Sequence, residues 1–114
     1  MANFDLEERC LRFALQADQY ILRLPKNIPN LEHSKQLSRS AGAVGTNYIE
    51  ANESLGTKDF KMRLRISRKE AKESRHWFFL TLPNSDQQKE KEALIQEASE
   101  LVKILSAIIN KARD

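Results

Sequence analysis

Four stretches of the chain repeat apolar residues at steps of three and four, the spacing that places side chains on one face of an α-helix. The stretches cover residues of about 5–24, 31–54, 58–82 and 86–112. Pro25 and Pro83 follow the first and third stretches, and proline ends a helix because it lacks an amide hydrogen and its ring clashes with the preceding turn. No strand-like alternation occurs, and the connections are short. The pattern predicts an all-α fold, an antiparallel up-down-up-down four-helix bundle that forms one domain over residues 1–114.

The repeating positions are the expected core of the bundle. In chain order they are Leu6, Cys10, Phe13, Ala17, Tyr20 and Leu24; Leu37, Ala41, Val44, Tyr48, Ala51 and Leu55; Phe60, Leu64, Ser67, Ala71, Ser74, Phe78 and Leu82; and Leu94, Ala98, Leu101, Leu105, Ile108 and Ala112. The second set is mostly small, which lets a neighbouring helix come close. Gly42 and Gly45 each cost about 1 kcal/mol relative to alanine inside a helix. We therefore expect the second helix to depend on packing for its stability.

Polar residues suggest where the helices begin. Asp5 and Thr57 are candidate N-caps, because their side-chain oxygens can accept hydrogen bonds from free amides of the first turn. Ser85 and Gln88 have the spacing of a capping box at the start of the fourth helix. Cys10 is the only cysteine, so the chain forms no internal disulfide, and we expect this residue to be a small core side chain.

The composition fits a helical domain and locates the positive charge in one segment. Apolar residues make up 40% of the chain and charged residues 31%, and there are only three glycines. The formal net charge is +3, but residues 57–82 hold eight Lys or Arg against three acids. The remainder of the chain is therefore slightly acidic. The basicity is local to the third helix.

On a helical wheel seven of the eight Lys and Arg residues of the third helix gather on one side, within an arc of about 120°. We call this the basic face; its residues are Lys58, Lys61, Arg65, Arg68, Lys69, Lys72 and Arg75. A face that serves only solubility usually mixes signs, whereas this one repels itself and would be stabilised by an anion. Cations at one-turn spacing can follow a phosphate backbone. All basic-face residues except Lys58 are therefore candidate contacts to RNA or DNA, with Arg39 and Lys35 of the second helix as possible support.

A second apolar band on the third helix exceeds what a monomeric bundle needs. Its residues are Met62, Ile66, Trp77 and Leu80, and we expect them to form an interface between subunits. The same band and the absence of a base-reading motif also leave open a different function. In that alternative the protein is an adaptor or scaffold subunit, and its partner is an acidic or apolar protein surface.

The sequence offers little chemistry for an enzyme. Glu73 and His76 form a Glu-x-x-His pair of the kind found in di-iron bundles, but such a site needs a second pair, and the only other histidine is His33. Glutamates spaced like Glu50 and Glu53, or Glu70 and Glu73, fit surface charges. We therefore expect no catalytic residue, no metal and no cofactor. The N-terminus resembles no signal peptide and no apolar run approaches the roughly 20 residues of a membrane span, which favours a cytoplasmic protein without membrane contact.

The segments SAGAVGTNYIEANESLGTKDF and RISRKEAKESRHW resemble a small bacterial family of four-helix bundle proteins. This family includes the product of the intervening sequence in bacterial 23S ribosomal RNA genes. The matching positions lie in the second and third helices, while the other two helices agree only in pattern. The residues on matching positions are Asn47, Glu50, Ala51, Asn52, Glu53, Asp59, Phe60, Glu70, Ala71, Lys72, Glu73 and Trp77.

The resemblance implies a ring-forming subunit, typically a pentamer, without known enzymatic activity. The chain is also similar to the accessory variability protein of diversity-generating retroelements, which implies nucleic acid and a reverse transcriptase as partners. The family implies structural roles for Asn47 and Glu50, and we expect Asn47 to make a hydrogen bond between helices. The combined prediction is a non-enzymatic, oligomeric binding module whose basic third helix contacts nucleic acid through phosphates.

Overall fold

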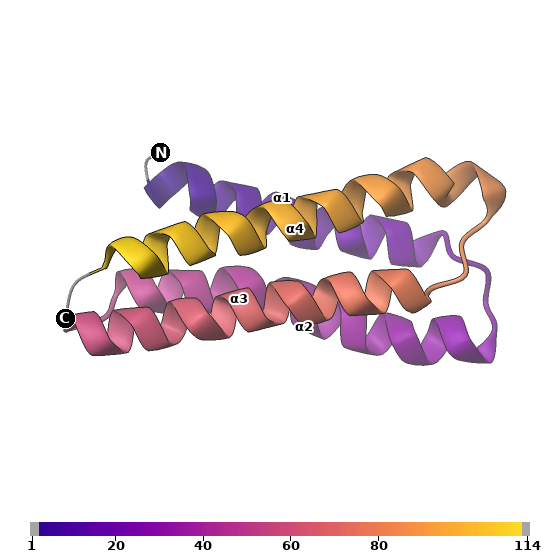
Figure 1. The fold of residues 1–114 in the computed structure, drawn as a ribbon. Coiled ribbons are helices and arrows are strands. Elements are labelled where there is room, and N and C mark those ends of the chain that lie inside the picture. The colour runs from indigo at the N-terminus through magenta and orange to yellow at the C-terminus, as the bar shows by residue number, and fades with distance from the viewer. Residues whose placement is uncertain (1–2, 113–114) are drawn as a thin grey trace.

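The computed structural model describes residues 3–112 and consists of four helices in sequence (Figure 1). They are α1 (Asn3–Leu22), α2 (Ile28–Asn52), α3 (Thr57–Leu80) and α4 (Gln88–Lys111), the last preceded by a 3-10 turn, η1 (Ser85–Gln87). Successive helices run in opposite directions, which confirms the predicted antiparallel four-helix bundle. The predicted bounds are within about three residues of those observed.

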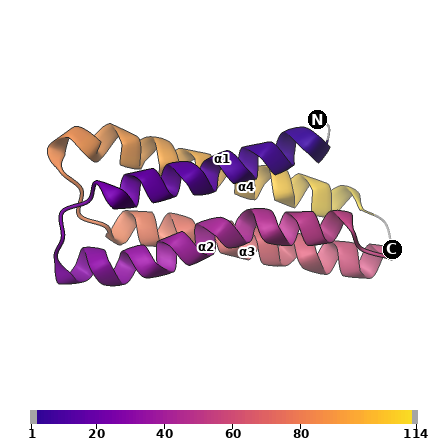
Figure 2. The same cartoon turned by 180° about the vertical axis from the view of Figure 1, so that it is seen from behind.

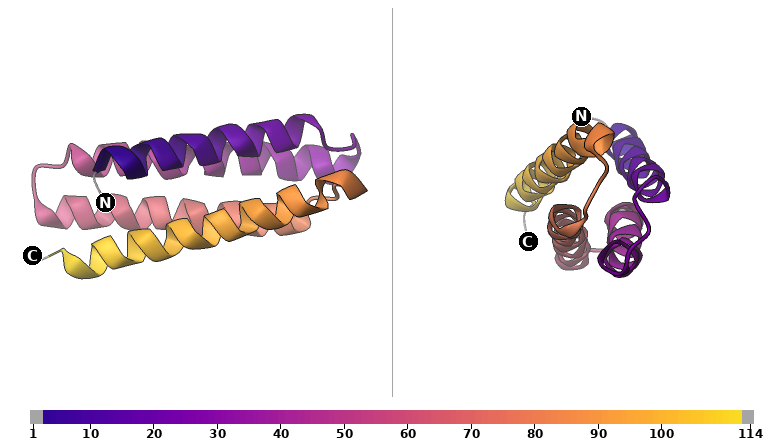
Figure 3. Two further views of the ribbon diagram at one scale, coloured as in Figure 1. Left: turned by 90° about the horizontal axis from the view of Figure 1, so that it is seen from above. Right: turned by 90° about the vertical axis from the view of Figure 1, so that its right-hand side faces the viewer.

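The helices stand at the corners of a four-sided bundle, in chain order around its axis (Figure 3). Each helix therefore packs against its neighbours in sequence, α1 closes the ring against α4, and α3 lies diagonally opposite α1. Seen from behind, α1 and α2 cover the other two helices (Figure 2). Helix α1 begins, and α4 ends, at the end of the bundle where α3 begins. One side of α3 thus faces outward along its whole length.

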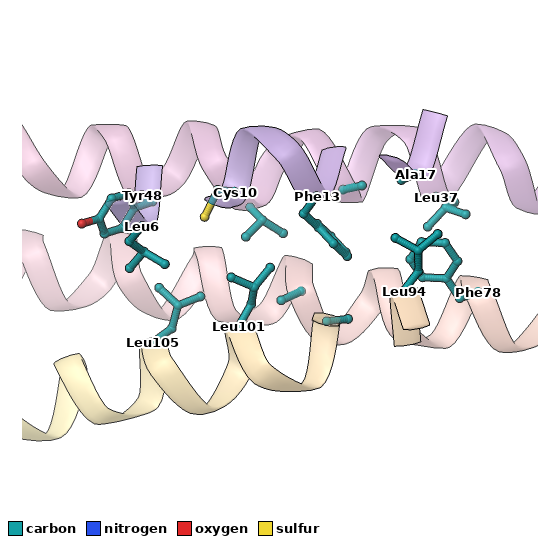
Figure 4. Packing of buried hydrophobic residues seen from close by; sticks show 14 of the residues in the cluster. Leu6, Cys10, Phe13, Ala17, Leu37, Tyr48, Phe78, Leu94, Leu101 and Leu105 are labelled. Atoms are coloured by element: carbon teal, nitrogen blue, oxygen red, sulfur yellow. The ribbon is translucent and has the colours of Figure 1, made fainter. Parts of the chain in front are cut away.

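The predicted core is largely confirmed (Figure 4). All six stripe residues of α1 and its following turn are buried, and so are five of six in α2 and five of seven in α3. The ring of Phe78 has no exposed surface and meets Phe13 and Tyr20 edge to face, with centroids 6.1 and 5.6 Å apart. Such contacts add to the free energy gained by burying the rings. Cys10 is buried as predicted.

Two core predictions at helix ends are wrong, and three other predicted core residues, Phe60, Ile108 and Ala112, are only partly buried. Leu55 is fully exposed because α2 ends at Asn52, and Leu82 is 54% exposed because α3 ends at Leu80. Beyond a helix end the side chain no longer follows the helical angle. In α4, Ile109 is buried, whereas the predicted Ile108 is only partly buried against the core.

The α2–α3 contact is built on small residues and serine hydroxyls. The Ser67 hydroxyl donates to the Val44 carbonyl at 2.7 Å, and the Ser74 and Ser40 hydroxyls are 3.0 Å apart. All three serines are fully buried, and each bond satisfies a polar group that would otherwise lack a partner away from water. On the side of α2 that faces α1, a Cβ at Gly45 would lie only 3.3 Å from the Cβ of Cys10. The small residues therefore let α2 approach both neighbours, as predicted.

The helix starts differ from the predicted caps by one or more residues. Asn27 caps α2 by accepting from the Asn30 amide at 2.9 Å, and Gly56 rather than Thr57 is the N-cap of α3. The capping box consists of Asn84 and Gln87, one residue before the predicted pair. Asp5 lies inside the first turn of α1, where the helix dipole still favours a carboxylate.

The buried side chain of Asn30 joins the α1–α2 connection to the α3–α4 connection, at the end of the bundle where α3 ends. Its amide group donates to the carbonyls of Pro25 and Leu82, at 2.8 and 2.9 Å, and its oxygen accepts from the Leu82 amide at 2.8 Å. The α1–α2 connection is thus tied to the end of α3. This junction fixes where α3 stops and the chain turns toward α4.

Candidate nucleic-acid interface

The structure places all seven basic-face residues along the outward side of α3. Lys58, Arg65, Lys69 and Lys72 are exposed, whereas Lys61, Arg68 and Arg75 are half-buried. At 1.5 Å per residue the row extends about 26 Å from Lys58 to Arg75. The core positions of α3 face the opposite way, as the buried Leu64, Ser67 and Phe78 show. The predicted contacts are therefore brought together on one accessible strip.

Two arginines of the strip are held in place by serines of α4. The Arg68 guanidinium donates to the Ser106 hydroxyl, and the Arg75 guanidinium donates to the Ser99 hydroxyl, both at 3.1 Å. The two arginines are seven residues apart on α3, and the two serines are seven residues apart on the antiparallel α4. The same contact is therefore repeated after two helical turns. A serine hydroxyl is neutral, so these contacts orient the arginines without cancelling their charge. Each guanidinium has five N–H donors and retains most of them for an anion.

Arginine pairing differs sharply between the basic face and the rest of the protein. Five of the eight arginines in the described part of the chain form ion pairs with carboxylates: Arg9 with Glu97, Arg12 with Glu8, Arg23 with Glu90, Arg39 with Glu70 and Glu73, and Arg63 with Glu50. The other three, Arg65, Arg68 and Arg75, have no carboxylate within 4 Å among residues 3–112. All three belong to the basic face. The unneutralised guanidinium charge is concentrated there.

The N-terminal part of the strip is hollowed. Thr57, Lys58, Lys61 and Arg65 line a surface depression of about 630 Å³. The N-terminus of α3 adds the positive end of a helix dipole to these cations. The strip therefore offers a recess for an anion at one end and an open row of cations beyond it.

The two α2 cations expected to support the basic face are paired with carboxylates. The Arg39 guanidinium lies between Glu70, at 3.4 Å, and Glu73, at 3.2 Å, and Lys35 pairs with Glu32 at 3.6 Å. Their charges are balanced locally. Glu70 was expected on the surface and is instead 7% exposed, because the close α2–α3 packing covers it. The α2 side of α3 is thus a seam of mixed charge that borders the basic face.

Two residues of the second apolar band are exposed, and the other two are partly buried beside the α2–α3 contact. Met62 and Leu80 are 43% and 40% exposed, whereas Ile66 is half-buried. Trp77 packs partly against the core, and its ring stacks on His33 of α2 with centroids 5.7 Å apart. Its indole Nε1 is buried and has no hydrogen-bond partner in the described structure. Met62 and Leu80 remain available to a second subunit.

The Glu73 and His76 pair is not organised as a metal site. Glu73 accepts from Arg39, and His76 lies edge-on to Trp77 at 5.1 Å between centroids. Among residues 3–112, no three His, Cys, Asp or Glu side chains are grouped so that they could hold a metal ion. Asn47 donates to the Ala43 carbonyl of its own helix at 2.9 Å, so the hydrogen bond expected between helices is instead within α2.

Sequence reasoning missed an apolar hollow between α1 and α2. It has a volume of about 530 Å³, and Leu11 and Ile49, 58% and 44% exposed, lie on its rim above Cys10 and the two glycines of α2. The glycines were a usable signal, because an added Cβ at Gly42 meets nothing within 4 Å. Burial raises the pKa of Cys10 to about 12, so the thiol beneath the hollow stays protonated near neutral pH.

No helix within residues 3–112 is long and apolar enough to cross a bilayer.

The fold and the basic face define a class: a small antiparallel four-helix bundle with one cationic helix side and no metal-binding group of His, Cys, Asp or Glu among its described residues. Within that class the chain belongs to the 23S rRNA-intervening sequence protein family, whose family model matches residues 3–107. The resemblance seen in two helices therefore extends over nearly the whole chain.

A solved structure supports the same relationship. The chain is similar to a Bacteroides thetaiotaomicron protein of unknown function from the S23 ribosomal protein family, whose crystal structure was determined at 1.70 Å resolution. The two share 27% sequence identity with a TM-score of 0.79, and the match covers 97% of this chain and 100% of the other. Comparison with curated proteins finds no significant match. The comparisons thus establish the family and the architecture.

Proposed function

We propose that the protein is a non-enzymatic, oligomeric module that binds nucleic acid through the phosphate backbone, with the basic face of α3 as the contact surface. The observation that supports this most directly is the arginine pairing. Arginines elsewhere in the described structure are matched with carboxylates, whereas Arg65, Arg68 and Arg75 are not. A guanidinium can bind phosphate through two parallel hydrogen bonds.

The dimensions of the strip suit a polyanion. Its length of about 26 Å corresponds to about seven or eight nucleotides at 3.4 Å per stacked residue of one strand. Each bound phosphate releases condensed counterions, so affinity falls as salt rises. Contacts to phosphate position a ligand without reading its sequence, so we expect weak sequence specificity.

Salt titration of binding tests this proposal. If the six candidate cations each contact one phosphate, log K against log[salt] should have a slope of about −5 for duplex DNA and about −4 for a single strand. Absence of binding at low salt, or binding that salt does not weaken, would refute the proposal. Both results are read by fluorescence anisotropy with a labelled 12-nucleotide strand and the corresponding duplex.

Charge reversal tests the location. Arg65→Glu with Lys72→Glu reverses two exposed basic-face residues, and the double variant should bind at least about tenfold more weakly at 100 mM salt. Lys26→Glu with Lys89→Glu is the matched control, since it changes the net charge equally at exposed positions away from the basic face. Equal losses in the two variants would mean that only the net charge matters. Circular dichroism at 222 nm checks that both fold.

The adaptor function is the second candidate, and the α1–α2 hollow favours it. Leu11 and Ile49 are both more than 40% exposed at this apolar surface, which lies between α1 and α2 and away from the basic face of α3. A defined protein that co-purifies after nuclease treatment would support an adaptor, whereas loss of every partner on nuclease treatment would contradict it.

Light scattering measures the oligomeric state, and a monomer would contradict the proposed subunit interface at Met62 and Leu80.

A further inference from the structure

A large aromatic side chain lies exposed in line with the basic face. Phe79 is 60% exposed, although its neighbour Phe78 is fully buried. At 100° per residue, Phe79 falls at the same angle as Lys61, near the middle of the basic arc, and one turn beyond Arg75. Among residues 3–112, no aromatic ring stacks on Phe79 or meets it edge to face. The row of cations therefore ends at the exposed aromatic ring of Phe79.

The surroundings of Phe79 remain cationic at the end of the helix. The last carbonyls of a helix carry partial negative charge, which would repel a phosphate. Here the Lys91 ammonium of α4 donates to the carbonyls of Phe79 and Thr81, at 3.2 and 3.0 Å. Lys91 thus places a positive charge at the backbone of Phe79, and Arg75 lies one turn before Phe79 on the same helix. An anionic strand that follows α3 can therefore reach Phe79 without meeting an uncompensated negative end.

We propose that Phe79 is a stacking surface for an unpaired base, and that the preferred ligand of the basic face is single-stranded nucleic acid. This inference rests on the proposed function. A single strand carries phosphates for the cations and exposed base faces for the ring, whereas the bases of a duplex are already stacked and paired. A purely apolar partner would cover the ring but would also have to desolvate the cations beside it.

Stacking of one base on an aromatic side chain is lost when the ring is truncated. Phe79→Ala should weaken binding of a 12-nucleotide single strand by about 5- to 150-fold and change binding of the matching duplex by less than about twofold. Phe79→Trp should retain single-strand binding, since it keeps a π-face, whereas Phe79→Leu should not. Leu55→Ala is the matched control, because Leu55 is a fully exposed apolar side chain outside both the basic face and the proposed subunit interface.

The outcomes separate this inference from the function on which it rests. Unchanged single-strand affinity in Phe79→Ala, full affinity in Phe79→Leu, or an equal loss for strand and duplex would each overturn the stacking role. If charge reversal at Arg65 and Lys72 still weakens binding in that case, phosphate binding stands alone. If the unmodified protein binds neither ligand, both proposals fail. Quenching of the new indole in Phe79→Trp by the bound strand, beyond any change at Trp77, gives a direct signature of stacking.

Discussion

Removing the Asn30 side chain should open the junction that ties the α1–α2 connection to the end of α3. The side chain is 2% exposed and makes three hydrogen bonds, to Pro25 and to both backbone groups of Leu82. In Asn30→Ala these three backbone groups lose a partner at once. At about 1 kcal/mol per bond, the expected loss of unfolding free energy is about 3 kcal/mol. This is a large share of the 5–15 kcal/mol typical of a folded domain.

Urea unfolding followed by circular dichroism at 222 nm measures this loss. For urea m-values of about 1–3 kcal/mol/M, the midpoint should fall by about 1–3 M. Asn110→Ala is the control, since Asn110 is exposed on α4 and should change stability by less than about 0.5 kcal/mol. A loss below about 1 kcal/mol in Asn30→Ala would refute the assignment of this residue as the junction, because water would then be replacing its bonds.

Asn30→Asp refines the same prediction through pH. The new carboxylate would face the Pro25 and Leu82 carbonyls, which now accept from the amide group. Burial and these oxygens should raise the pKa of the introduced acid above its unfolded value of about 3.9. Stability relative to the unmodified protein should therefore be greatest below that value and decline as pH rises toward the raised pKa. Urea midpoints at pH 4 and pH 7 give the comparison, and a pH-independent difference would contradict it.

Three further predictions concern the core and the α1–α2 hollow. Phe78→Ala should lower the unfolding free energy by about 3–5 kcal/mol, measured by urea unfolding, because the ring is fully buried between Phe13 and Tyr20. Gly42→Ala should raise the melting temperature by about 4 °C, since helix propensity improves by about 1 kcal/mol and the added Cβ meets nothing; a lower melting temperature would contradict this. Cys10, whose pKa burial raises to about 12, should react with a thiol reagent at pH 8 only when urea unfolds the protein.

The fold was predictable because the apolar period persists through each helix. Predictions failed where a helix ended, as at Leu55 and Leu82, or where two positions competed, as at Ile108 and Ile109. A strict seven-residue repeat favours Ile108, but a nearly straight helix drifts by about 20° per heptad, which brings Ile109 inward by the end of α4. The period alone does not reveal how far a helix supercoils.

The candidate site was predictable as a surface but not as a set of contacts. One helix contains the basic face, so the wheel was sufficient to place Lys61 and Arg65 together. The neutralisation of Arg39 by Glu70 and Glu73 depends on how closely α2 and α3 pack, and the serines that hold Arg68 and Arg75 come from α4. Such pairings join residues more than twenty positions apart. They follow from the register between helices, which periodicity within one helix does not specify.

The separation of α3 into a buried side and a charged side has a consequence for how this protein can diversify. No residue belongs both to the core side of α3, which includes Leu64 and Ala71, and to its basic face. The two sets alternate within one continuous helix of 24 residues. Substitutions on one side are therefore nearly independent of those on the other. The surface charge of α3 can be changed while the core of the bundle is kept. The basic face can therefore be exchanged without redesigning the core. Introducing its Lys and Arg residues into a related bundle with a neutral α3 surface is a direct way to transfer ligand binding.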